Sequence, residues 1–119
     1  MKKLLLVVLL MVGFLGTAQK MSPKFLKGTW ETEFHTVEFK GENKKDFSIT
    51  VTYTDTGEDV EVIGWAFEKG KLYIETIYRP TEFKAIGKIV IMDENTMVED
   101  VASDYPGVLI YRRIQTQEK

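Results

Sequence analysis

The most regular feature of the chain is an alternation of apolar and polar residues with a period of two. Phe47, Ile49, Val51 and Tyr53 alternate with serine or threonine at every position between them. This alternation is typical of a β-strand with one buried face. Similar runs, separated by turn-forming residues, predict eight strands: 28–34, a strand around 37–39, 47–54, 60–67, 72–78, 83–92, 96–101 and 108–114.

Two breaks in the alternation predict irregular backbone. Beyond His35 the apolar residues change to the opposite parity, which indicates a bulge or bend between the first two strands. The parity changes again at Gly64, where a glycine inside a strand indicates a bulge or a sharp bend. Ahead of the strands, Ser22 as N-cap and the proline that follows it predict a single helical turn over 22–27.

These elements predict an all-β fold. Strands joined by short connections usually lie side by side, so we expect an antiparallel up-and-down meander. Eight strands is also a number that closes into a small barrel without free edges. We therefore expect a closed or nearly closed barrel, and a two-sheet sandwich is the alternative.

The N-terminal segment has the organisation of an export signal. Two lysines precede an apolar run over 4–15, and small residues follow up to Ala18. This order predicts a signal peptide over 1–18, since a membrane anchor needs roughly 20 apolar residues. Gln19 stands where a lipoprotein would have a cysteine. We therefore expect a periplasmic or secreted protein that is not a lipoprotein and is not membrane-embedded after cleavage, with one domain over 19–119.

Composition narrows the possible functions. The 119 residues include no cysteine and one histidine, which excludes disulfides, thiolate metal sites and sites built on several imidazoles. The formal net charge is −2, and removal of the two lysines of the predicted signal leaves −4. Such a charge argues against binding to nucleic acid by phosphate neutralisation.

Two short motifs at the ends of the predicted barrel resemble a known family. Gly28 and Trp30 form a Gly-x-Trp at the start of the first strand, and Arg113 follows Tyr111 on the last. This pairing resembles the calycin superfamily, and especially its small bacterial secreted lipocalin-like domains. The resemblance implies a barrel whose closed end is formed where the arginine packs across the tryptophan, with a small hydrophobic ligand bound in the open end.

Barrel closure independently predicts the contact between Trp30 and Arg113. If the last strand pairs antiparallel with the first, the start of one lies beside the end of the other. A guanidinium on an indole face contributes about 0.5–2 kcal/mol, depending on burial. The alternative is that Trp30 is an ordinary core residue and Arg113 a solvated charge.

Aromatic residues in the middle strands are the candidate ligand-binding residues. We expect Tyr53, Trp65, Phe67 and Tyr78 to line a pocket for a small hydrophobic molecule, and the alternative is that they only pack the core. A second hypothesis is a protein–protein binding module with a solid barrel core. The binding surface of such a module would be the outer face around Tyr73, Ile77 and the loop at 79–80.

The sequence indicates no catalytic or metal site. His35 has no second histidine or cysteine to complete a metal site, and we interpret it as an exposed turn residue. The acidic groups at 58–61 and 93–94 lack the spacing of a calcium loop and read as solvated turn charges. No serine lies in a Gly-x-Ser-x-Gly motif. We therefore predict a binding protein, with no enzymatic activity and no cofactor. The least favoured alternative is a hydrolase, which would need His35 beside a carboxylate and a serine in one cleft.

Overall fold

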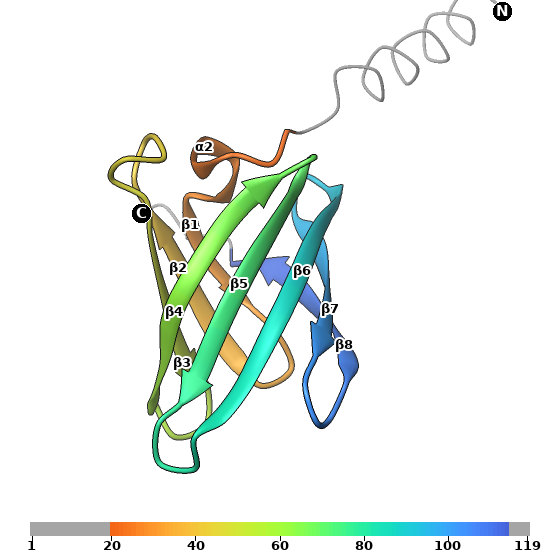
Figure 1. Ribbon diagram of the computed structural model, residues 1–119. Coiled ribbons are helices and arrows are strands. Elements are labelled where there is room, and N and C mark those ends of the chain that lie inside the picture. The colour runs from red at the N-terminus through yellow and green to blue at the C-terminus, as the bar shows by residue number, and fades with distance from the viewer. Residues whose placement is uncertain (1–19, 115–119) are drawn as a thin grey trace, which may run out of the picture.

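The computed structural model describes residues 20–114, which form a closed barrel of eight antiparallel strands with a short helix at one end (Figure 1). The predicted all-β meander is confirmed, and the two-sheet alternative is not. The elements are α2 (Pro23–Leu26), β1 (Gly28–Glu31), β2 (His35–Lys40), β3 (Ser48–Tyr53), β4 (Asp59–Glu68), β5 (Lys71–Tyr78), β6 (Phe83–Asp93), β7 (Thr96–Ala102) and β8 (Gly107–Arg113). The signal peptide predicted over 1–18 lies outside the described residues. Within residues 20–114, no helix has the length and apolar character needed to cross a membrane.

The barrel closes along a short seam between its first and last strands. Each strand pairs with the next, and β1 pairs with β8 through Trp30 opposite Arg113 and Glu31 opposite Arg112. The amide of Ile114 extends the seam by donating to the Thr29 carbonyl at 2.9 Å. Closure therefore relies on few backbone pairs, so contacts between side chains at the seam are needed to hold β1 against β8.

The turn between β1 and β2 differs from the sequence prediction. The first strand was expected to reach residue 34, with a bulge or bend at His35; the chain does bend, but β1 already ends at Glu31 and the bend lies at residues 33–34. The Thr32 hydroxyl accepts hydrogen bonds from the amides of Phe34 and His35 at 3.2 and 3.0 Å. A threonine side chain that satisfies backbone donors in this way competes with the extended strand. Phe34 consequently leaves the core face and is 53% exposed.

The predicted bulge at Gly64 is confirmed. The pairing of β4 with β5 shifts between Val62 and Gly64, and the inward face of β4 changes parity there. Val62 faces the interior before the shift, and Trp65 and Phe67 face it afterwards. The register of β6 and β7 also shifts near residues 91–93, which the sequence pattern did not predict.

At the end of the barrel that carries α2, the side chains of Arg113 and Trp30 pack on each other and fill the interior. Trp30 is fully buried, and the Arg113 guanidinium lies 4.3 Å from the centroid of its ring. The indole Nε1 donates to the Leu26 carbonyl at 2.8 Å, and Arg113 donates to the Phe25 carbonyl at 2.9 Å. The predicted approach of Trp30 and Arg113 is therefore present, and the helical turn is tied into it. Ser22 caps that turn by accepting from the Phe25 amide at 3.2 Å.

Replacement of Trp30 tests how much this end of the barrel contributes to stability. We expect Trp30→Ala to lower the free energy of unfolding by about 3–5 kcal/mol, because it leaves a cavity and removes the stacking surface of Arg113. The measurement is urea-induced unfolding. As a control, Ile86→Ala on the outer face should change stability by less than about 0.5 kcal/mol. A loss below about 1 kcal/mol for Trp30→Ala would show that the ring is not a core element.

Candidate ligand-binding site

A cavity of about 420 Å³ opens at the end of the barrel opposite α2. Its walls are mostly apolar side chains that point inward from the strands, among them Val51, Val60, Ile74, Ala85, Val101 and Leu109. Trp30 and the ring of Phe47 fill the α2 end, whereas the wall of the cavity includes the small residues Ala85 and Gly107, and most of its aromatic residues lie around the mouth. The interior is therefore not the solid core that the protein-binding alternative required.

Aromatic rings surround the mouth of the cavity. The ring of Tyr53 packs against His35 at 4.9 Å and edge-on against Tyr78 at 5.2 Å. Phe83 and Tyr105 pair at 5.9 Å on another side. All five residues line the cavity. An entering molecule would therefore contact aromatic faces first.

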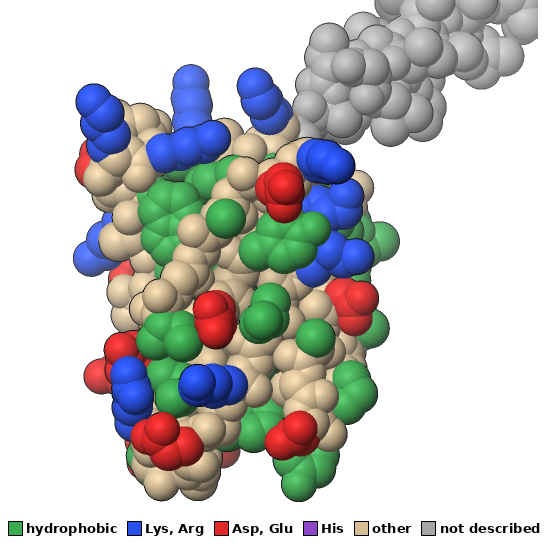
Figure 2. Space-filling view, viewed as in Figure 1, with side chains coloured by type: hydrophobic (Ala, Val, Ile, Leu, Met, Phe, Trp, Pro, Cys, Tyr) green, Lys and Arg blue, Asp and Glu red, His purple; other side chains and the backbone are tan. Residues whose placement is uncertain are grey.

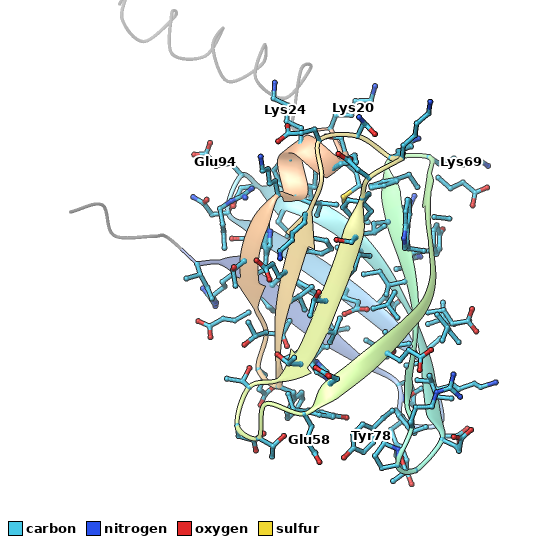
Figure 3. All side chains as sticks on the ribbon, turned by 90° about the vertical axis from the view of Figure 1, so that its left-hand side faces the viewer. Lys20, Lys24, Glu58, Lys69, Tyr78 and Glu94 are labelled. Carbon is cyan, nitrogen blue, oxygen red and sulfur yellow. The ribbon has the colours of Figure 1, made fainter. Side chains whose placement is uncertain are left out.

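Tyr78 is anchored at this rim by an acidic residue. Its hydroxyl donates to Glu58 at 2.8 Å, and this hydrogen bond raises the pKa of Tyr78. Figure 3 shows Glu58 and Tyr78 close together at the end of the barrel opposite α2. The hydroxyl therefore stays protonated and holds the ring in place.

Two of the four predicted ligand-binding aromatics line the cavity. Tyr53 and Tyr78 do so, whereas Trp65 and Phe67 do not. Trp65 packs edge-on against Phe47 with centroids 4.8 Å apart, and Phe67 packs against the same ring at 5.3 Å. Both lie in the second half of β4, which runs toward the α2 end (Figure 1). Strand parity placed all four inside correctly, but parity carries no information on the height of a residue along the barrel.

The interpretation of His35 as an exposed turn residue is wrong. His35 is the first residue of β2, is half-buried and lines the cavity. Burial lowers the pKa of its imidazole, which favours the neutral form. Ser103 and Glu99 line the same cavity, but within residues 20–114 no hydrogen bond links any two of these three side chains. The arrangement needed for a serine hydrolase is therefore not assembled.

Glu99 is the functional candidate that sequence reasoning missed. It lies in the middle of β7 and lines the cavity, although it is only 8% exposed. The Tyr111 hydroxyl donates to its Oε1 at 2.8 Å. Its carboxyl occupies the space over Gly87, where a methyl group would overlap it. The alternation of Met97, Glu99 and Val101 places the glutamate on the inward face, and that signal was available in the sequence.

The protonation of this buried pair follows from its surroundings. Burial raises the pKa of the Glu99 carboxyl above its ordinary value of 4.5, and the hydrogen bond from Tyr111 offsets part of the rise. Burial also raises the pKa of Tyr111 well above its usual range, and the nearby Glu99 adds to this. Tyr111 therefore keeps its proton and remains a hydrogen-bond donor to Glu99.

The outer face proposed for a protein partner is less available than expected. Ile77 is 2% exposed, and Tyr73 is half-buried. Ile77 pairs with Glu61 across the strands, and Arg79 donates to that carboxylate at 2.7 Å. The ion pair flanks Ile77, so this side chain offers little surface to a partner.

The acidic groups at 58–61 and 93–94 are at or near turns, and their carboxyl side chains are exposed. In the part of the chain that the structure describes, no three histidine or acidic side chains are grouped so as to hold a metal ion.

Comparison of the chain with protein-family models, with curated proteins and with solved structures gives no match. The function is therefore inferred from the chemistry of the cavity itself.

The raised pKa of Glu99 predicts a pH-dependent cost to stability. The folded protein holds the Glu99 proton more firmly than the unfolded chain does, so the contribution is fully present below pH 4.5 and is lost as the pH rises through the folded-state pKa. Glu99→Gln has no such titration and can still accept from Tyr111. The free energy of unfolding of Glu99→Gln, compared with that of the unaltered protein, should therefore increase as the pH rises. The increase is about 1.4 kcal/mol for each pH unit by which folding raises the pKa of Glu99.

Urea unfolding across this pH range measures the difference between the two proteins. The exposed Glu68→Gln is the matched control, since it removes one negative charge from the surface. A stability difference between Glu99→Gln and the unaltered protein that stays constant with pH would contradict a proton held by burial at Glu99.

Proposed function

We propose that this chain is an exported, lipocalin-like protein that binds a small apolar molecule in the open end of its barrel. The observation that carries the proposal is the cavity of about 420 Å³, because small-molecule sites commonly have volumes of about 300–1,000 Å³ and mostly apolar walls. The barrel is filled at the α2 end and hollow at the other. This combination is what a container for a small ligand requires.

The residues that carry the lipocalin resemblance support the proposal. Trp30 and Arg113 are in contact at the filled end, where the resemblance requires a tryptophan and an arginine. Gly28 begins β1 in a left-handed conformation with φ of 123°, which a residue with a side chain rarely adopts. We propose a binding role without catalysis, and export directed by the signal predicted over 1–18.

Filling the cavity tests the proposed binding site. Ala85 lines the cavity, so the indole of Ala85→Trp would occupy part of it. We expect the unaltered protein to bind the neutral apolar dye phenylnaphthylamine, with a rise in dye fluorescence, and Ala85→Trp to lose most of this binding. Ala66→Trp is the matched control, because Ala66 is exposed on β4 between two inward residues. Equal dye binding by Ala85→Trp and the unaltered protein would refute this site.

Expression of the full sequence in a bacterial host tests export. We expect the protein in the periplasm or medium, with Gln19 as its first residue, because the small residues at the end of the apolar run favour cleavage after Ala18. Intact mass spectrometry of each cell fraction measures the position of the N-terminus. A chain that begins at Met1 and stays in the cytoplasm would contradict the proposal.

A further inference from the structure

The cavity contains a carboxyl group and no lysine or arginine to balance it. Glu99 is the one carboxyl among its lining residues, and none of those residues is lysine or arginine. The imidazole of His35 is the remaining basic group there, and burial favours its neutral form. An anionic ligand would therefore meet a carboxyl group without any cation to pair with.

One oxygen of Glu99 is available to a ligand. Oε1 accepts from Tyr111, and among the described residues no hydrogen bond reaches Oε2. Within the same residues, every fully buried side-chain oxygen or nitrogen has a hydrogen-bond partner. Oε2 is therefore not fully buried, and the cavity that Glu99 lines gives access to it.

The loops at the mouth of the cavity are mostly acidic, so their charge has the same sign as that of the Glu99 carboxylate. The loops at 32–34, 54–58, 79–82 and 103–106 contain five acidic residues and one arginine, Arg79, which is already paired with Glu61. At the opposite end, the segments 20–27, 41–47, 69–70 and 94–95 contain six lysines and three acidic residues. Figure 2 shows basic side chains crowding the α2 end of the visible face, with most acidic ones nearer the other end, and Figure 3 places Lys20, Lys24 and Lys69 at the α2 end. This distribution attracts cations to the mouth and repels anions.

The aromatic rim of the cavity also favours a cationic molecule. Tyr53, Tyr78, Phe83 and Tyr105 line the cavity around the mouth. The faces of such rings attract ammonium groups as well as apolar surface. Attraction to these rings would offset part of the cost of removing water from a cation that enters the cavity.

From the carboxyl group in the wall, the acidic mouth and the aromatic rim, we infer that the ligand is a small amphiphilic amine. This inference rests on the proposed function and specifies its ligand class. The ammonium group donates a hydrogen bond to Oε2 of Glu99, and the apolar part lies along the walls toward Tyr53 and Tyr78. Fatty acids are disfavoured, because their carboxylate would face Glu99.

Pairing with an ammonium group also removes an unfavourable feature of the empty cavity. A buried carboxylate without a counter-charge is costly, which is why burial raises the pKa of Glu99. A cation at hydrogen-bond distance stabilises the ionised carboxylate and lowers that pKa. Recognition of the amine and ionisation of Glu99 are therefore coupled.

Three ligands with the same apolar chain test the inference. Decylamine, decanol and decanoate differ only in the polar group, so isothermal titration calorimetry compares a cation, a neutral group and an anion on one protein. We expect decylamine to bind most tightly and decanoate most weakly. Glu99→Gln should weaken decylamine by at least about tenfold, because a close charge pair is lost, and should leave decanol unchanged. The matched control is Glu68→Gln, which removes one exposed charge at the α2 end, outside the mouth loops and the cavity lining.

The outcomes separate this inference from the proposed function. If decanol binds but decylamine binds no more tightly, or if Glu99→Gln leaves decylamine binding unchanged, the amine inference fails and the container remains. If none of the three ligands binds, the proposed function fails. Should circular dichroism show that Glu99→Gln is unfolded, the order of the three ligands on the unaltered protein decides, and decanoate binding as tight as that of decylamine overturns the inference.

Discussion

The contact of Arg113 with Trp30 holds the first and last strands of the barrel together. β1 and β8 share only two register pairs, so the seam needs side chains to hold it. The Arg113 guanidinium stacks on the indole and donates to the carbonyls of Phe25, Lys27 and Glu94. One side chain on β8 thereby joins the seam to the helical turn and to the turn between β6 and β7. Burial lowers the pKa of Arg113, as expected for a cation partly removed from water.

The hollow end follows from how this filled end is built. Eight strands enclose a space that side chains can just fill. Trp30 fills it near α2, together with the rings of Phe47, Trp65 and Phe67. At the other end the aromatic rings lie around the mouth, the wall includes Val51, Ala85 and Val101, and the carboxyl of Glu99 has its room because Gly87 has no side chain. Burial of a carboxyl without a counter-charge lowers stability, which is consistent with the binding role proposed for Glu99.

Much of the fold was predictable because alternation of side chains reports directly on strand faces. The eight strands, the bulge at Gly64 and the approach of Trp30 to Arg113 all follow from parity and from short connections. The turn after Glu31 was not predictable in this way, because it depends on hydrogen bonds to the Thr32 hydroxyl. The candidate site was predicted less well. Parity cannot tell which inward residue lies at which height, so Trp65 and Phe67 were grouped with Tyr53 and Tyr78, and Glu99 was overlooked because acidic residues in strands usually face solvent.

The central claim is that ligand binds in the hollow end and that the filled end takes no part. Methyl NMR spectra of the protein titrated with decylamine test it most directly, because both ends carry assignable methyl groups. The account predicts that the resonances of Val51, Val101 and Leu109 shift, while those of Leu26, Leu72 and Met97, which lie in the core and do not line the cavity, stay in place. Shifts confined to these core residues or to the outer face would contradict it.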